Sequence, residues 1–113
     1  MKKYPRVSAA NNKMGYTMKF VLDPAKEKIN IQKHKISFTE SCYVFADQYS
    51  LNLFDEQHSE DEDRWITLGQ TPNGKILVVV HTFQKIDKIE VIRIISSRKA
   101  TKKETKKYLE RRG

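Results

Sequence analysis

The sequence has little cysteine, glycine and proline: one, four and three residues respectively in a chain of 113. A single cysteine, Cys42, excludes an intramolecular disulfide framework and favours a reducing cytoplasm. The longest apolar runs, at residues 76–80 and 92–95, are too short to span a bilayer. No apolar stretch follows the first basic residues as a secretory signal would require. We therefore expect a cytoplasmic protein without a membrane partner.

Positive charge exceeds negative charge, and the charged residues are unevenly distributed along the chain. Twenty-two Lys and Arg residues against 14 Asp and Glu residues give a net charge of +8. This surplus attracts polyanions, and nucleic acid, an acidic protein and a membrane surface all fit it. Residues 55–63 hold six acidic residues, whereas residues 98–113 hold eight basic and two acidic residues. The acidic run lacks the spacing of a calcium loop and is interpreted as a solvated loop, with contact to a basic partner as a second use.

Periodicity and capping signals predict a small α+β fold in the order β-α-α-β-β-β-β-α, an antiparallel β-sheet with two N-terminal helices and one C-terminal helix. Asp23 with Pro24, and the pairs Ser37/Glu40 and Thr101/Glu104, are typical helix starts. Residues 1–15 are expected to be a flexible leader before one domain at 16–113. The expected strands are 16–22, 50–54, 64–69, 76–83 and 89–97, and the expected helices are 24–34, 38–46 and 102–112.

The strand spacing also predicts how the elements pack. Turns at residues 71–74 and 84–88 join the last three strands into an antiparallel meander, with the valine-rich strand at its centre. The inner side of the second helix is expected to carry Phe38, Cys42 and Phe45. The inner side of the first helix is expected to include Ala25 and Ile29, with Gln32 and Ile36 on or near it.

Two arginines occupy strand positions that packing alone would fill with aliphatic residues. Arg93 lies between Ile92 and Ile94, and Arg64 shares its strand face with Ile66. Such a charge needs a partner or a ligand. For Arg93 two alternatives are open at this stage: an internal carboxylate, such as Glu90 or Glu104, or a functional phosphate site, since a guanidinium binds phosphate with two parallel hydrogen bonds.

The histidines offer one candidate for proton transfer. His34 lies between Lys33 and Lys35, where neighbouring cations favour a neutral imidazole able to accept a proton. The alternative is a histidine that interacts with its own helix C-terminus. His81 fits a hydrogen-bonded core histidine, and His58 fits an incidental loop residue.

No phosphate loop, nucleophile elbow, Cys/His pair or metal-binding spacing is found. Cleavage of RNA suits this inventory, because the substrate supplies its own 2′-hydroxyl nucleophile and the protein need only transfer protons and stabilise charge on phosphorus. Such a reaction would need neither a metal nor a cofactor. A binding module that uses the same basic surface without chemistry is the alternative.

Several ordered motifs resemble the BrnT toxin family over about residues 20–108. The family is the toxin half of a bacterial type II toxin–antitoxin pair, with a fold similar to RelE-like ribonucleases. The motifs are Asp23-Pro24-Ala25-Lys26, Asn30, Lys33-His34, Ser37-Phe38, Glu40, Val44-Phe45, Arg64, residues 66–69, 77–82 and 93–101, Glu104 and Tyr108.

The resemblance implies a ribonuclease that stops translation and growth by cutting RNA. It implies a BrnA-like antitoxin with a ribbon-helix-helix domain that binds operator DNA. The catalytic residues that it implies are Arg64, Arg93, Arg98, His34, Glu104 and Tyr108, and the implied RNA-binding residues are Lys26, Lys33, Lys99 and Thr101. We expect Arg93 and Arg98 to stabilise the phosphorane and His34 or Tyr108 to handle the proton. Lys35 stands where the family usually has glycine, and Leu22 where it has tryptophan.

Overall fold

The strands and helices follow the order predicted from the sequence, except that a short 3-10 helix at Glu56–His58 was not predicted. The structure, a computed structural model, describes residues 17–59 and 62–113, and the leader expected at 1–15 lies outside this part of the chain. The elements are β1 (Thr17–Val21), α1 (Pro24–His34), α2 (Phe38–Ser41), the 3-10 helix η1 (Cys42–Ala46), β2 (Leu51–Phe54), the 3-10 helix η2 (Glu56–His58), β3 (Arg64–Gln70), β4 (Ile76–Ile86), β5 (Ile89–Lys99) and α3 (Lys102–Arg112).

The five strands form one sheet in the order β1-β5-β4-β3-β2. The predicted meander of β3, β4 and β5 is confirmed, and β4 is central. The sheet is not purely antiparallel, because β1 pairs with β5 in parallel. This pairing places the first strand of the domain beside the last. The chain leaves β1 directly into α1, which therefore begins at the β5 side of the sheet.

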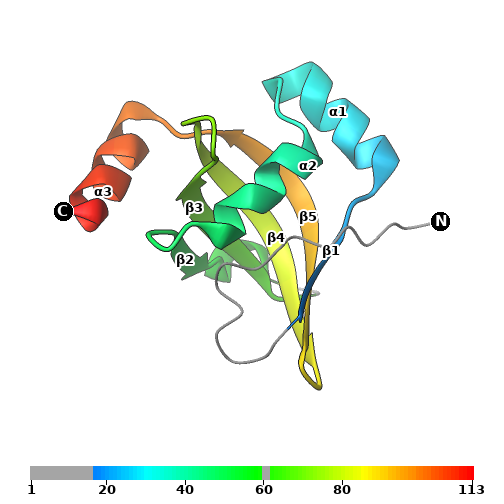
Figure 1. Cartoon of the computed structure of the whole chain (residues 1–113). Coiled ribbons are helices and arrows are strands. Elements are labelled where there is room, and N and C mark those ends of the chain that lie inside the picture. Colours follow the sequence, from blue (N-terminus) through cyan, green and yellow to red (C-terminus); the bar gives the residue numbers. More distant parts are fainter. Residues whose placement is uncertain (1–16, 60–61) are drawn as a thin grey trace.

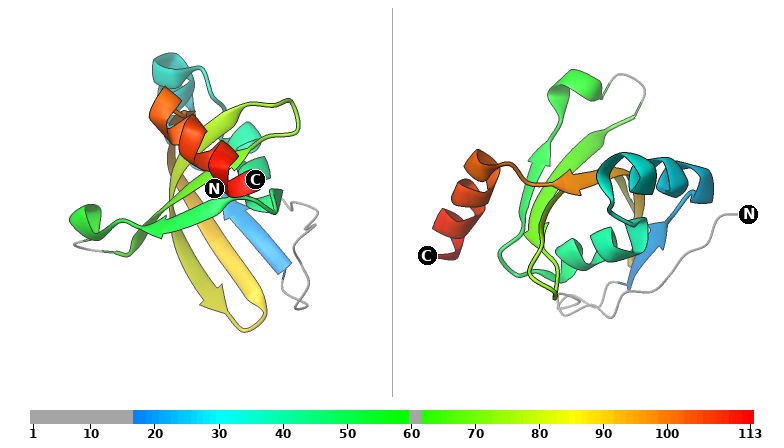
Figure 2. Two further views of the ribbon diagram at one scale, coloured as in Figure 1. Left: turned by 90° about the vertical axis from the view of Figure 1, so that its left-hand side faces the viewer. Right: turned by 90° about the horizontal axis from the view of Figure 1, so that it is seen from above.

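Helices cover the two faces of the sheet unequally. In Figure 1, α2 and η1 cross in front of the sheet, α1 lies beside β5, and α3 stands apart at the other side; the view from above separates α3 from α1 and α2 in the same way (Figure 2). The main core lies between α2, η1 and one face of the sheet. It contains Phe20, Ile36, Phe38, Cys42, Val44, Phe45, Leu77, Val79, Ile92 and Ile94.

The inner side of α1 differs from the prediction. Ala25 and Gln32 are exposed and Ile29 is 61% exposed, whereas Asn30 is the buried residue of this helix. The partly or fully buried positions are Glu27, Asn30 and His34, a helical spacing of three and four residues. An apolar stripe is absent from α1 because this helix contacts its neighbours through polar side chains. Ile36, just beyond the helix, is buried as expected.

Asn30 attaches α1 to the sheet. Its amide nitrogen donates to the Ser97 carbonyl at 2.8 Å, and the Ser97 backbone N–H donates to the Asn30 oxygen at 3.0 Å. The same amide nitrogen donates to the Ile36 carbonyl at 2.8 Å. The side chain thus replaces the backbone of a neighbouring strand at the edge of β5, beyond the residues that pair with β1. These bonds satisfy buried backbone groups that would otherwise be costly to leave unpaired.

The second predicted helix is divided into α2 and η1. Ser37 caps it as predicted, with its hydroxyl accepting from the Glu40 N–H at 3.0 Å. Phe38, Cys42 and Phe45 are buried, as predicted. The change to 3-10 geometry brings η1 close to β3: a Cβ added at Gly69 would lie 2.9 Å from the Val44 Cβ. Glycine is therefore required where η1 crosses β3.

A smaller cluster forms where α3 meets the opposite face of the sheet. Leu68, Val78 and Tyr108 are buried in it. The predicted capping box is confirmed: the Glu104 N–H donates to the Thr101 hydroxyl at 3.2 Å, and the Thr101 N–H donates to the Glu104 carboxylate at 2.8 Å. Within the described ranges, no helix combines the length and the apolarity that crossing a bilayer requires.

His81 is the core histidine that the sequence predicted. It is 1% exposed, its Nδ1 lies 3.0 Å from the Thr82 carbonyl, and its Nε2 lies 2.7 Å from the Thr67 hydroxyl. Because a carbonyl can only accept, Nδ1 carries the proton of the neutral ring. Burial lowers the pKa of His81 to about 4.

Replacing Lys35 with glycine should stabilise the protein. Lys35 is the C-cap of α1 and has φ 62°, the left-handed region that favours glycine. We expect Lys35→Gly to raise the free energy of unfolding by about 0.5–1 kcal/mol in urea denaturation. Lys35→Ala removes the same charge but keeps a Cβ, so it should give no such gain. An equal gain from both variants would refute the backbone explanation.

Stability should fall as the pH drops from 7 to 5 because of His81. In the unfolded state the His81 imidazole has the ordinary pKa of 6.5, whereas in the folded protein its pKa is about 4. Acidification through this window therefore favours unfolding, by about 2 kcal/mol between pH 7 and pH 5. His81→Gln should lose this pH dependence in urea denaturation at the two pH values. His58→Gln, in the exposed acidic loop, should retain it; equal pH dependence in all three proteins would contradict the assignment.

Candidate functional site on the arginine face

Strand register aligns two arginines across the middle of the sheet. Arg64 of β3 pairs with Thr82 of β4, and Thr82 pairs with Arg93 of β5. Directly paired residues project to the same side of an antiparallel sheet. The three side chains therefore form one row, with the two arginine Cα atoms about 10 Å apart because two interstrand spacings separate them.

A bulge brings Arg98 to the same side. The β4–β5 register shifts between Val80 and His81, so that Ser96 pairs with Val80 while Ile94 pairs with His81. Arg98 pairs with Val78, which lies four residues before Thr82 on β4. Without the extra residue in β5, two positions five apart would point to opposite sides. We call the side that carries Arg64, Arg93 and Arg98 the arginine face.

Arg93 has a carboxylate partner in the acidic loop. Its guanidinium donates one hydrogen bond to Glu62, and the two side chains are 29% and 48% exposed. Of the two alternatives open for Arg93, the structure shows a carboxylate partner, and this partner is Glu62 rather than Glu90 or Glu104. Glu62 was not predicted as the partner because it is 31 residues from Arg93 in the sequence. The loop before β3 reaches β5 only because β4 pairs with both strands.

Arg98 is held more completely by Glu104. The guanidinium donates two hydrogen bonds to the two carboxylate oxygens, at 2.8 and 3.0 Å. The arginine holds the pKa of the Glu104 carboxyl down at about 2, and the same pairing raises the pKa of Arg98. Glu104 also accepts from the Thr101 N–H, so the pair connects the end of β5 to the start of α3.

The two arginines therefore differ in their availability to a ligand. The Arg98 fork is filled by a carboxylate in the bidentate geometry that a phosphate would use. Arg93 gives a single bond to its carboxylate, and Arg64 makes no side-chain hydrogen bond to another of the residues that the structure describes. The guanidinium groups of Arg64 and Arg93 are thus less fully paired with carboxylates than that of Arg98.

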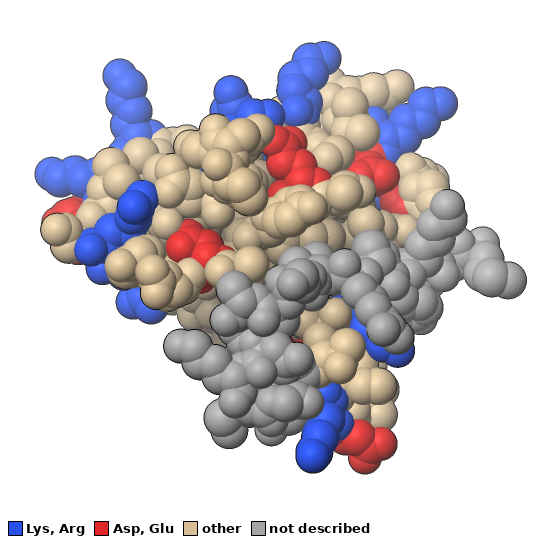
Figure 3. Space-filling view, in the orientation of Figure 1, with Lys and Arg blue, Asp and Glu red and all other residues tan. Residues whose placement is uncertain are grey.

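The remaining residues implied by the family pattern lie around the ends of β5 and α1. Lys99 and Thr101 follow Arg98 and are exposed. Lys26 and Lys33 are exposed on α1, while His34 is half-buried one helical turn beyond the Asn30 that is bound to β5. Lys and Arg side chains project along the upper and left edges of the molecule, over α1 and α3 (Figure 3).

Tyr108 is placed differently from the other site residues. It is 1% exposed and donates its hydroxyl hydrogen bond to Asp47. Burial, followed by the bond to Asp47, raises the pKa of Tyr108 to about 12. Asp47 also accepts from the Gln70 N–H at 2.8 Å. Tyr108 thus joins α3 to η1 and β3, and this environment suits a structural role better than proton transfer.

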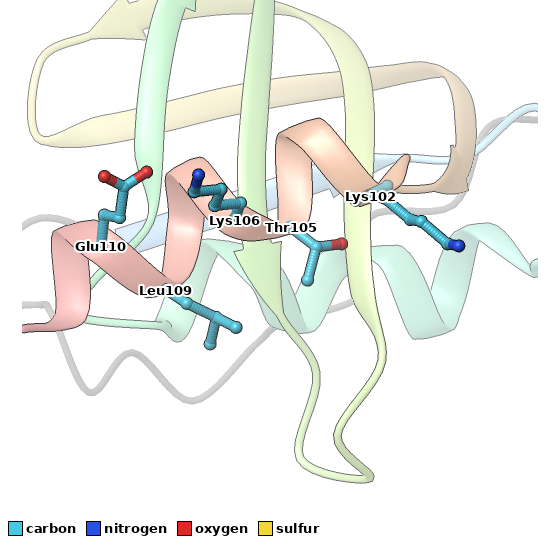
Figure 4. A pocket seen from close by; sticks show the side chains of 6 residues that line it. Lys102, Thr105, Lys106, Leu109 and Glu110 are labelled. Atoms are coloured by element: carbon cyan, nitrogen blue, oxygen red, sulfur yellow. The ribbon is translucent and has the colours of Figure 1, made fainter.

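A hollow lies along α3. Leu109, which is 50% exposed, provides its apolar part. Figure 4 shows the lining side chains on successive turns of the helix. They are Ala100, Lys102, Thr105, Lys106, Leu109 and Glu110. No group of three or more His, Cys, Asp or Glu that could hold a metal ion is found among residues 17–59 and 62–113.

Sequence reasoning missed three residues that shape the site. Asn30 had no signal except its place in the family pattern, because an apolar stripe was expected on α1. Glu62 belongs to the acidic run, which was interpreted only as a solvated loop or a partner contact. Thr82 could have been found by aligning β3, β4 and β5, since the hairpin turn after β3 fixes the row to which it belongs.

The chain was compared with known proteins. The family model described as "Ribonuclease toxin, BrnT, of type II toxin-antitoxin system" matches residues 22–104. Among solved structures, the chain is similar to the crystal structure of the Brucella abortus ribonuclease toxin BrnT, with a TM-score of 0.50 and 20% identity over 72% of this chain and 94% of that one. No curated protein matches. The structural likeness shows a shared fold, and since the family model covers most of the chain, the protein belongs to the BrnT family of ribonuclease toxins of type II toxin–antitoxin systems.

Proposed function

We propose that the protein is an endoribonuclease toxin that cleaves RNA without a metal and thereby inhibits translation and growth. The observation that carries the proposal is the position of Arg64 and Arg93 in one row of the arginine face. Two guanidinium groups in one row of the sheet, on β3 and β5 with only β4 between them, are suited to hold one phosphodiester and to stabilise the added charge of its transition state.

The reaction uses a nucleophile that belongs to the substrate. The 2′-hydroxyl oxygen attacks the adjacent phosphorus while a general base removes the hydroxyl proton. The bond from phosphorus to the 5′-oxygen breaks, and a general acid protonates that oxygen. The products are a 2′,3′-cyclic phosphate and a free 5′-hydroxyl. The protein supplies proton transfer, orientation and cationic stabilisation of the phosphorane.

His34 is the proposed general base. It is half-buried on the inner side of α1, and the two bonds between Asn30 and Ser97 fix the helix at the edge of β5. No side-chain hydrogen bond joins His34 to another described residue, so its ring nitrogens are free to meet substrate. We propose His34 in preference to Tyr108, because the Tyr108 hydroxyl is buried and bound to Asp47.

The other family-pattern residues have supporting roles in the proposal. Arg98 and Glu104 fix the start of α3 through their bidentate pair. Thr101 caps α3. The exposed Lys26, Lys33 and Lys99 steer the RNA backbone, a role in which flexible point charges suffice.

Membership of the family implies an antitoxin partner. We propose that this partner is a BrnA-like protein whose ribbon-helix-helix domain binds operator DNA. The proposed complex neutralises the toxin in the cytoplasm, where its RNA substrate is found. The alternative function, a binding module without chemistry, would use the same basic surface and would leave RNA intact.

Alanine at Arg64 or Arg93 should abolish toxicity. Expression of the chain alone in bacteria is expected to arrest growth and degrade RNA, and each substitution should lower the cleavage rate about 10²–10³-fold. Arg112→Ala, at the end of α3, should cleave within about twofold of the parent. Growth rate and RNA integrity are measured together with thermal unfolding. If wild type and both variants are equally harmless when folded, the protein is a binding module.

His34→Gln and Tyr108→Phe should separate the two candidates for proton transfer. Loss of the base should lower kcat about 10²-fold or more, with little effect on stability. Tyr108→Phe should keep kcat but lower the free energy of unfolding by about 1–2 kcal/mol, because Asp47 loses a hydrogen bond. The reverse pattern, a large loss of kcat only in Tyr108→Phe, would return the role to Tyr108.

A further inference from the structure

Thr82 occupies the central position of the arginine row. It pairs with Arg64 on one side and with Arg93 on the other, and its side chain is half-buried. Its hydroxyl has no hydrogen-bond partner among residues 17–59 and 62–113. On the core face, the ring of His81 donates to the Thr82 carbonyl at 3.0 Å, which restrains the backbone at this position. A residue with a hydroxyl donor and a restrained backbone thus stands between two arginines in the row.

An anionic oxygen is already bound at one end of this row. The Glu62 carboxylate accepts from the Arg93 guanidinium, and both side chains are partly exposed. The carboxylate stands in for one oxygen of a phosphodiester, since both are anionic acceptors of guanidinium hydrogen bonds. The bond is single, in contrast to the bidentate pair of Arg98 and Glu104.

We infer that Arg64, Thr82 and Arg93 form one subsite for an RNA phosphodiester, in which Thr82 is a further RNA-contact residue and Glu62 is the internal competitor that RNA displaces. The inference rests on the proposed function, which it deepens by assigning a third donor and a competing group to the same site.

The charges and the geometry favour displacement by RNA. A partly exposed pair with a single hydrogen bond is worth little, because water and salt screen it. A phosphodiester offers two free anionic oxygens, which the two guanidinium groups and the Thr82 hydroxyl can all reach from one row. The Glu62 carboxylate keeps Arg93 paired in the free protein, so that its charge is not left alone on the half-buried strand face.

Removal of the Thr82 hydroxyl should weaken RNA binding. The probe is a short 2′-O-methylated RNA oligonucleotide, which lacks the 2′-hydroxyl nucleophile and so binds without being cut. Thr82→Val keeps the branched shape but loses the donor, and should raise Kd about 10-fold. Thr82→Ser keeps the donor and should bind within about twofold of wild type. Thr39→Val, on the exposed surface of α2, should also bind like wild type.

Removal of the Glu62 charge should strengthen RNA binding. Glu62→Gln should lower Kd about threefold, because the internal competitor for Arg93 is weakened. Glu56→Gln makes the same charge change in the same loop, so it measures the general electrostatic contribution. In an Arg93→Ala background, Glu62→Gln should give no more gain than Glu56→Gln, since the contact through which it acts is absent.

The outcomes separate this inference from the proposed function. The inference is overturned, and the proposed function stands, if wild type cleaves RNA while the Thr82→Val and Glu62→Gln variants bind RNA like wild type. Weaker binding in Thr82→Ser as well as in Thr82→Val also overturns it, since the hydroxyl would then not be the cause. Wild type that neither binds nor cleaves RNA overturns the proposed function itself. Thermal unfolding of each variant confirms that a folded protein is compared.

Discussion

The register between β4 and β5 is the constraint on which the arrangement of the site depends. One extra residue in β5, opposite the junction of Val80 and His81, brings Arg98 onto the side that already carries Arg93. The same register places Ser97 toward α1, where its backbone meets Asn30. A slip of one residue would turn the arginines toward the apolar core and would break the attachment of α1. The buried Ile92 and Ile94 oppose such a slip, because it would expose them.

Positive charge on the arginine face is balanced inside the molecule. Glu104 satisfies Arg98 with two bonds, and Glu62 satisfies Arg93 with one. The first pair is built into the cap of α3, so separating it would also weaken the helix start. The second pair involves a surface loop and carries no such cost. A basic protein of net charge +8 can thus stay folded without RNA, while part of its phosphate-binding surface remains exchangeable.

Local signals in the sequence predicted most of the fold. Asp23, Ser37 and Thr101 each cap the helix assigned to them, because a cap depends only on neighbours within three residues. The side chains on α1 were placed wrongly, since its inward contacts are hydrogen bonds of Asn30 and Glu27 and not an apolar stripe. The parallel pairing of β1 and the carboxylate partner of Arg93 depend on residues far apart in sequence. No local pattern encodes such contacts.

The attachment of α3 has a consequence for local stability. Tyr108 is its buried side chain. Its polar contacts include hydrogen bonds from Arg98 to Glu104, from Arg111 to the Tyr49 carbonyl and from Arg112 to Gln70. The main core around Phe20 and Phe38 includes no residue of this helix. We therefore expect α3 to be a separate cooperative unit in native-state hydrogen exchange. Its amides should exchange through openings that uncover Leu68 and Val78, while those of β4 and β5 exchange only on global unfolding.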